Sequence, residues 1–402
     1  MADTHRRRVA RNHSTIIEGT LAQRPIRLCF VIRSLDSGGA ERQLTELVTR
    51  LDKSRFDVSV LTFYPGGLFW DAIELAPGVR LACLGKTGRW DVARFAARLV
   101  ARLRRLRPDV VHGYMEVANE FAWLGGRASG ARVVWGLRAS NRDPGSYDWP
   151  LRASLYVSAG LSRFVDLVIS NSHAGLQHHI RQHGLRCRSA VVVPNGIDTD
   201  HFRPRPEARQ RVRQVWGVND SEFLIGLAAR LDPKKDHETF LEAMVRLAAK
   251  HPQLRVACIG NDPSAAGRYV AGCRFAGLLG ARVRWEPVRR DMEHVLPGLD
   301  ALVMSSACGE GFPNVVGEAM AAEVPCIVTD VGDAAALLAD VQRTVPPRDP
   351  ERLRLACERL MGQSPDERGR LGARDRRRIV EHFGTARLVE RTTKLLHDLA
   401  CA

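Results

Sequence analysis

Short apolar segments alternate with helical segments along most of the chain, in two successive series. Strands of four to eight residues separated by helices are typical of βαβ units, whose parallel strands are joined by right-handed crossovers. The apolar segments lie at residues 26–33, 57–63, 108–111, 131–137, 166–172 and 189–194, and again at 222–229, 254–260, 281–285, 301–306 and 325–330. The sequence therefore predicts an α/β chain with two tandem Rossmann-like, doubly wound parallel sheets.

The length of 402 residues fits two domains and a shorter C-terminal segment, because domains average roughly 150 residues. Residues 1–24 are polar and Arg-rich, which predicts a disordered basic tail. We expect the first domain at residues 25–197, the second at 198–380, and a C-terminal helix at 381–402. Two such domains place strand ends and helix N-termini across a common cleft, where an anionic ligand is expected.

The chain is strongly basic: 60 Lys and Arg residues against 45 Asp and Glu give a net charge of +15, and only six of the 60 are Lys. Such an excess of Arg predicts nucleic acid, an anionic membrane surface or phosphorylated ligands as partners. The nine cysteines form no C-x-x-C pair, which argues against a disulfide framework or a zinc site. With no apolar signal segment and no run near the ~20 residues that cross a bilayer, we expect a cytoplasmic protein.

The first candidate motif, at residues 37–42, follows the first strand and opens the first helix. Gly38 and Gly39 let the backbone approach a ligand, and free N–H groups at a helix start attract anions. The motif lacks the G-x-G-x-x-G spacing of dinucleotide-binding proteins. The same residues would also suit a tight strand-to-helix turn with no ligand.

The second motif follows the first strand of the second series. Arg230 and Lys235 lie in the loop before a helix that starts near residue 237. Two cations beside a helix N-terminus suit a pyrophosphate, although a solvated basic turn has the same composition.

The third motif contains two glutamates eight residues apart. Glu310 precedes a loop shaped by Gly311 and Pro313, and Glu318 lies about one turn inside the helix predicted over residues 314–322. Carboxylates placed in this way accept hydrogen bonds from sugar hydroxyls. A surface turn and a surface helix residue are the alternative, but the apolar neighbours of both glutamates favour a buried site.

Six short motifs in this order resemble glycosyltransferase family 4, the retaining GT-B glycosyltransferases, over about residues 25–400. They are Gly-Gly-Ala-Glu (38–41), Asp-Val-Val-His (109–112), Pro-Asn-Gly-Ile-Asp (194–198), Arg-Leu-x-Pro-x-Lys (230–235), the two glutamates at 310 and 318, and Thr-Asp-Val-Gly (329–332). The resemblance implies a GT-B fold with an interdomain cleft. The first domain would take the acceptor, the second would take a nucleotide-sugar donor, and the C-terminal helix would cross back onto the first domain.

The resemblance also implies roles for single residues. As catalytic residues, Arg230 and Lys235 would neutralise the leaving diphosphate, and Glu310 would lie at the donor sugar, while Glu318 would hold the ribose hydroxyls. The remaining residues implied to bind substrate are Gly38, Gly39, Asn195, Gly311, Phe312, Pro313, Asn314 and Val315.

Two positions in the first domain correspond to histidines of the family. The family's short His motif reads here as residues 135–141, with Arg138 in place of His; Arg cannot act as a base, but it can bind a phosphate or an acidic sugar. His112 is retained, either as a ligand contact or as a structural residue at a strand end. A further departure is Asp236, which stands where the family has Gly.

The predicted reaction is transfer of a sugar from a nucleotide-diphosphate sugar to a saccharide or a lipid-linked saccharide, in cell-envelope or exopolysaccharide synthesis. Retention without an evident base suggests a front-face mechanism, in which the departing phosphate oxygen accepts the acceptor's proton. We expect no metal and no other cofactor. His178, His179 and His183 are not accompanied by the Glu of H-E-x-x-H, because Ile180 follows His179, so we interpret them as a surface helix face.

A membrane surface is a further expected partner, at the inner face of the plasma membrane. Residues 91–107 place four arginines on one helical stripe and an apolar stripe beside it, as an interfacial helix near anionic lipid does. The same pattern is that of an ordinary helix packing its apolar stripe on a sheet.

Rival functions are a nucleotide-sugar epimerase of GT-B fold and a basic nucleic-acid-binding protein. The glutamate pair together with Arg230 and Lys235 favours sugar transfer over epimerisation. Dispersed Arg residues and only 6 % aromatic residues argue against nucleic acid as a partner.

Overall fold

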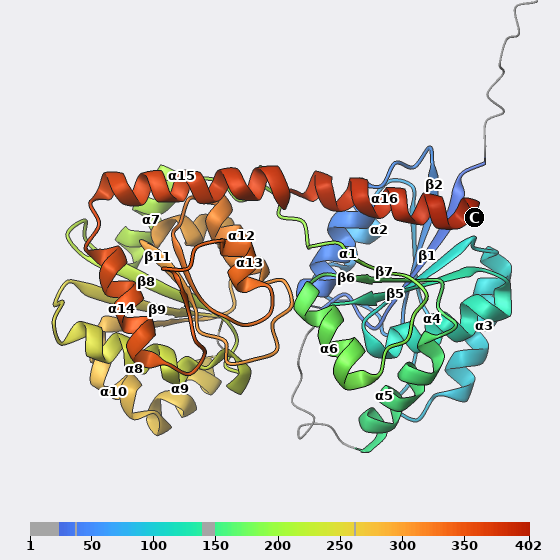
Figure 1. The fold of residues 1–402 in the computed structure, drawn as a ribbon, viewed down its shortest axis with the longest axis horizontal. Coiled ribbons are helices and arrows are strands. Elements are labelled where there is room, and N and C mark those ends of the chain that lie inside the picture. Colours follow the sequence, from blue (N-terminus) through green and yellow to red (C-terminus); the bar gives the residue numbers. More distant parts are fainter. Residues whose placement is uncertain (1–23, 37, 139–148, 261–262) are drawn as a thin grey trace, which may run out of the picture.

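The computed structural model describes residues 24–36, 38–138, 149–260 and 263–402. It consists of two α/β domains side by side, with the C-terminal helices running along both (Figure 1). The predicted tail falls almost wholly outside the described residues. Arg24, its last residue, donates to both carboxylate oxygens of Asp109 at 2.8 and 2.9 Å.

The N-terminal domain is built on a seven-stranded parallel sheet in the order β3-β2-β1-β4-β5-β6-β7. Its strands are β1 Ile26–Ile32, β2 Phe56–Thr62, β3 Val79–Cys83, β4 Val110–Tyr114, β5 Arg132–Leu137, β6 Leu167–Ser170 and β7 Ala190–Val192. Its helices are α1 Gly39–Arg50, α2 Trp70–Glu74, α3 Ala93–Leu106, α4 Glu116–Ser129, α5 Trp149–Ser162 and α6 His173–His183. Alternate residues of β1 pack on opposite faces of the sheet: Phe30 and Ile32 join one buried cluster, and Cys29 and Val31 join another. Both faces of the sheet are therefore covered.

The C-terminal domain repeats the plan with a six-stranded parallel sheet in the order β10-β9-β8-β11-β12-β13. Its strands are β8 Phe223–Ala228, β9 Leu254–Ile259, β10 Val283–Glu286, β11 Ala301–Met304, β12 Cys326–Thr329 and β13 Thr344–Val345. Its helices are α7 Pro206–Trp216, α8 His237–Ala248, α9 Pro263–Gly272, α10 Arg274–Leu279, α11 Met292–Val295, α12 Asn314–Ala321, α13 Ala334–Leu338, α14 Pro350–Met361 and α15 Pro365–His382. The two sheets confirm the predicted fold class, although β3 and β13 were not predicted.

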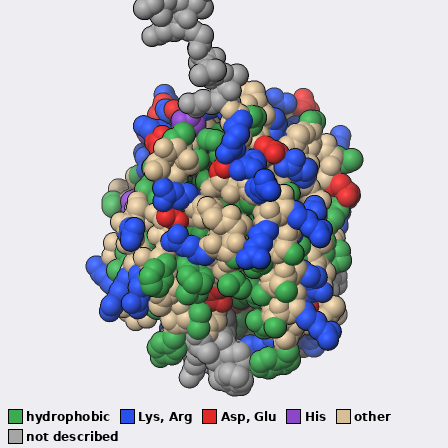
Figure 2. All heavy atoms as spheres, turned by 90° about the vertical axis from the view of Figure 1, so that its right-hand side faces the viewer, with side chains coloured by type: hydrophobic (Ala, Val, Ile, Leu, Met, Phe, Trp, Pro, Cys, Tyr) green, Lys and Arg blue, Asp and Glu red, His purple; other side chains and the backbone are tan. Residues whose placement is uncertain are grey.

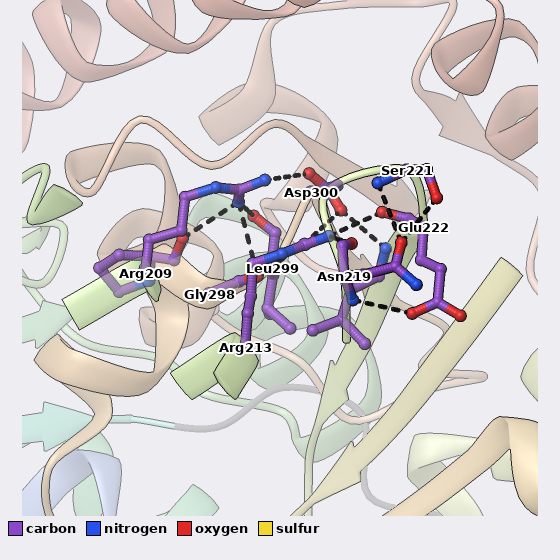
Figure 3. A network of polar contacts seen from close by, with 10 residues as sticks. Arg209, Arg213, Asn219, Ser221, Glu222, Gly298, Leu299 and Asp300 are labelled. Carbon is purple, nitrogen blue, oxygen red and sulfur yellow. Dashed lines mark hydrogen bonds and ion pairs between the residues drawn. The ribbon is translucent and has the colours of Figure 1, made fainter. Parts of the chain in front are cut away.

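Helix α7, in the polar stretch between the sheets, is fixed to the C-terminal domain by a buried ion-pair network (Figure 3). Asp300 accepts hydrogen bonds from Arg209 at 2.6 Å and Arg213 at 2.8 Å, and from the backbone N–H of Leu224 at 2.7 Å. Arg213 also donates to the carbonyl of Glu222 at 2.7 Å. The network therefore joins α7 to the starts of β8 and β11.

Helices α15 and α16 (Thr385–Cys401) carry the chain back across both domains (Figure 1). Between them, the carbonyl of Phe383 accepts from the N–H of Ile197 at 2.8 Å, and the N–H of Thr385 donates back to Ile197 at 3.0 Å. Beyond this bridge, Leu388 and Leu396 are buried in the core of the N-terminal domain. The predicted return of the C-terminal helix is thus part of the observed fold.

The helix expected at a membrane interface is α3, and its apolar stripe faces the protein interior. Phe95, Leu99 and Leu103 are fully buried against the sheet and α4. Of the two interpretations that the pattern allowed, the structure therefore shows packing of this stripe on the sheet. Figure 2 shows the end of the N-terminal domain, where Lys and Arg side chains are spread over much of the face and hydrophobic side chains gather in its lower part.

Candidate active site

A cavity of about 670 Å³ lies between the two domains, at the carboxyl ends of both parallel sheets. In doubly wound folds this edge is where ligands bind. Twelve of the fourteen predicted site residues line the cavity: Gly38, Gly39, Arg138, Asn195, Arg230, Lys235, Glu310, Gly311, Phe312, Pro313, Asn314 and Val315. The other two, His112 and Glu318, lie outside its lining.

The C-terminal wall carries the two predicted cations. Arg230 follows β8, is exposed, and forms no ion pair within the described ranges. Lys235 ends a short 3₁₀ helix, Pro233–Lys235, and pairs with Glu310, which also accepts from the Ser306 hydroxyl at 2.6 Å. Glu310 is only 8 % exposed, so both partners hold a nearly buried carboxylate at the cavity wall.

Asp236 has a left-handed backbone with φ of 48°, which is why glycine suits this position in the family. The Asp236 side chain compensates by capping α8, because it accepts from the N–H of Thr239 at 3.1 Å. The departure from glycine therefore keeps the loop that carries Lys235 in place.

Glycines allow the two domains to approach at the cavity. A Cβ on Gly39 would lie 2.9 Å from Asn314 Nδ2, and a Cβ on Gly311 would lie 2.9 Å from Asn171 Oδ1. The first contact joins the start of α1 to the start of α12, and the second joins the 309–315 loop to the end of β6. Asn171 was not predicted, although its place at the end of the 166–172 segment is a signal that it faces the cleft.

Arg138 starts a chain of polar contacts that crosses the cavity. Its guanidinium stacks on the Tyr114 ring at 4.5 Å and donates to the Tyr114 hydroxyl at 2.9 Å. It also donates to Asn195 Oδ1 at 3.4 Å, and Asn195 Nδ2 donates to Asn314 Oδ1 at 2.8 Å. Arg138 therefore links the N-terminal wall to the first residue of α12, and none of the described residues supplies it with a carboxylate partner.

His112 lies beneath this wall and is 1 % exposed, packed against Phe30 and Tyr114. Burial, reinforced by the nearby Arg138 charge, holds its pKa well below the usual range, so the ring is neutral. Neither ring nitrogen has a partner among the described residues. This placement favours the structural interpretation of His112 over ligand contact.

Glu318 lies one turn further along α12 than Asn314 and is 5 % exposed. Arg42, from α1 of the N-terminal domain, forms an ion pair with it. Burial raises the pKa of Glu318, and the Arg42 charge opposes that rise. Arg42 belongs to the 37–42 motif, but no local pattern indicates that it lies beside Glu318.

Comparison with known proteins identifies the fold and the family. The Glycosyltransferase Family 4 model matches residues 37–201, and the Glycosyl transferases group 1 model matches residues 222–363, together more than half of the chain. The chain belongs to these glycosyltransferases. This membership supports sugar transfer over the epimerase interpretation.

Relatives of this glycosyltransferase include the putative glycosyltransferase EpsF of Bacillus subtilis, 24 % identical over 76 % of the chain and 79 % of EpsF. A D-inositol 3-phosphate glycosyltransferase of Streptomyces scabiei is 26 % identical over 90 % of the chain and 88 % of its own length. The crystal structure of Anabaena HepE with UDP-glucose has a TM-score of 0.80 at 20 % identity and covers 93 % of the chain and all of HepE.

The histidines of α6 do not form the expected surface face. The ring of His183 lies 4.8 Å from that of His178 and 4.9 Å from that of His179, and His179 is only 7 % exposed. Across the described residues, no group of three His, Cys, Asp or Glu side chains is arranged to hold a metal ion.

Within those same ranges every helix is too short or too polar to span a bilayer.

Proposed function

We propose that this glycosyltransferase moves a sugar from a nucleotide-diphosphate sugar to a saccharide or lipid-linked saccharide, with retention, in cell-envelope or exopolysaccharide synthesis. The observation that carries the proposal is the interdomain cavity, in which Arg230 and Lys235 lie at the carboxyl ends of the C-terminal strands. Support comes from the solved structures of Anabaena HepE with UDP and with UDP-glucose, and from the named activity of the Streptomyces relative.

The chemistry follows from the charges at this wall. When the bond between the sugar C1 and the diphosphate oxygen breaks, its electron pair stays on the leaving oxygen, where Arg230 and Lys235 stabilise it. The acceptor hydroxyl bonds to C1 on the same face, and its proton passes to the departing phosphate oxygen. Glu310, held by Lys235 and Ser306, accepts hydrogen bonds from the donor sugar. In this mechanism the protein's own side chains supply the positive charge, and no metal ion or cofactor takes part.

The test is the anomeric configuration of the product, followed by NMR with the best donor from a panel of UDP-, GDP- and ADP-sugars. We expect the donor's configuration to be kept and turnover to survive dialysis against EDTA. An inverted product contradicts the front-face mechanism, and activity that requires an added metal contradicts the assigned roles of Arg230 and Lys235.

A finer proposal concerns location, at the inner face of the plasma membrane. Arg94, Arg102 and Arg105 are exposed on α3, on the stripe beside its buried stripe, and would attract anionic lipid without insertion. Co-sedimentation with vesicles should show more binding to phosphatidylglycerol mixtures than to phosphatidylcholine alone. Replacing the three arginines with Gln should remove that preference, and equal binding to both vesicles would contradict the proposal.

A further inference from the structure

Arg42 makes the direct contact between the first helix of the N-terminal domain and the buried carboxylate of Glu318. Its Nη1 donates to Glu318 Oε1, and its guanidinium lies 5.6 Å from the Phe202 ring. Within the described part of the chain, Arg42 is the one residue that forms an ion pair with Glu318. A buried carboxylate without a partner is strongly destabilising, so this contact between the domains is energetically important.

The fold fixes the direction of Arg42. Its neighbour Gln43 is buried and forms two hydrogen bonds of 2.8 Å with Gly196, one to the carbonyl and one from the N–H. The start of the same helix abuts α12, where Gly39 leaves room for Asn314. Helix α1 is therefore held at two points that flank Arg42, one on the interdomain segment and one on α12.

The contact leaves half of the carboxylate free. Oε1 of Glu318 accepts from Arg42, whereas Oε2 accepts no hydrogen bond from the described residues and is not fully sealed from solvent. The other charged groups that act on Glu318 are His201 and Glu293, which pair with each other at 3.3 Å. Arg42 is thus the described cation that pairs with Glu318 and opposes the rise in its pKa that burial causes.

We propose that Arg42 is a positioning residue of the donor site, which orients Glu318 so that Oε2 accepts from the donor's ribose hydroxyls. The inference rests on the proposed sugar transfer and on the role that the family resemblance implies for Glu318, contact with the donor's ribose hydroxyls. Because Arg42 and Glu318 come from different domains, the donor site is complete only when α1 is docked on α12. Donor binding and domain docking are therefore coupled through one ion pair.

The experiment compares the donor KM and kcat of four variants with the wild type, using the UDP-, GDP- or ADP-sugar that gives the largest thermal shift. The variants are R42Q, E318Q, the double variant, and R50Q as the control. Arg50 lies on the same helix and pairs with Asp198 and Glu46, away from the cavity lining. Loss of a hydrogen bond to a buried charge should raise the donor KM of R42Q by about tenfold or more, whereas R50Q should change it little.

Two further readouts separate positioning from a general structural effect. The double variant should bind the donor no more weakly than E318Q alone, because both changes disrupt one unit. The donor KM is expected to rise at acidic pH, where Glu318 becomes protonated. In R42Q this rise should begin at a higher pH, because Glu318 loses the cation that opposes its protonation. If R42Q does not fold, R42K, which keeps the charge without the planar fork, should show a smaller loss in the same direction.

A folded R42Q with the wild-type donor KM, an equal loss in R50Q, or additive losses in the double variant would overturn the inference. If E318Q weakens the donor and R42Q does not, only this inference fails. If E318Q also leaves donor binding unchanged, the proposed role of Glu318 fails with it.

Discussion

Replacing Lys235 with Gln removes one of the two charges that the account assigns to the leaving diphosphate. A positioned group that stabilises developing charge contributes about 10²–10³ in kcat, and we expect K235Q to lose about a hundredfold. The donor KM should change less than kcat, because the leaving group gains its charge as the bond breaks.

K235Q should also lower the stability of the protein, because Lys235 pairs with Glu310. The Glu310 carboxylate, 8 % exposed, would keep the Ser306 hydroxyl but lose its cation. Leaving a buried group under-satisfied costs about 1–3 kcal/mol, which corresponds to a fall in Tm of roughly 2–12 °C in a domain of this size. Adding E310Q to K235Q should recover part of the lost Tm, because the second change removes the unpaired charge. It should recover none of the lost kcat.

The assay is the initial rate of nucleoside diphosphate release at saturating donor, with Tm followed by differential scanning fluorimetry. Lys234 gives a matched control, since it belongs to the same 3₁₀ turn but does not line the cavity. K234Q should keep both kcat and Tm. Wild-type turnover in K235Q, or the same loss in K234Q, would contradict the role of Lys235 at the leaving diphosphate.

Three further predictions concern packing, burial and protonation. G39A should raise the donor KM several-fold in steady-state assays, because its Cβ would lie 2.9 Å from Asn314 Nδ2 at the contact between the domains; an unchanged KM would contradict that contact. D300A should lower the unfolding free energy measured in urea by about 3–5 kcal/mol, because it leaves the buried Arg213 without its carboxylate; a loss under about 1 kcal/mol would mean that the network is dispensable. Burial lowers the pKa of His237 to about 4. As the pH falls below about 6.5, the unfolded state therefore binds a proton that the folded state does not. About 3 kcal/mol of stability should be lost between pH 6.5 and 4. H237Q should flatten the urea-derived unfolding free energy between pH 6.5 and 4. An unaltered pH dependence in this variant would contradict the role of His237.

Apolar strand segments were predictable because both faces of these sheets are buried, which leaves continuous apolar runs in the sequence. Residues 26–33 were recognised for this reason, and the observed β1 is buried on both faces. Strands β3 and β13 were missed because their sequences give a weak signal: β3 reads VRLAC and is only partly buried, and β13 is the two residues TV. The apolar stripe of α3 could not be assigned from periodicity, since a membrane surface and a protein core select the same pattern.

The site was predictable where motifs lie at strand ends, because topology brings those ends together. Arg230 and Glu310 were found in this way. Arg42, Tyr114 and Asn171 were missed, because their importance comes from contacts between residues far apart in the sequence. Arg42 and Glu318 are separated by 276 positions, and no local pattern encodes such a pairing.

The most direct test of the central claim is a thermal-shift titration with UDP-, GDP- and ADP-glucose on the wild type and on a variant with Ala at Arg230. A ligand at 100 times its Kd adds about 2.7 kcal/mol to the folded state, so one of the three should raise Tm by roughly 5–10 °C. The shift should be much smaller in the Arg230 variant. No shift of the folded wild type with any of the three, or an equal shift in both proteins, would contradict binding of the donor diphosphate at this cavity.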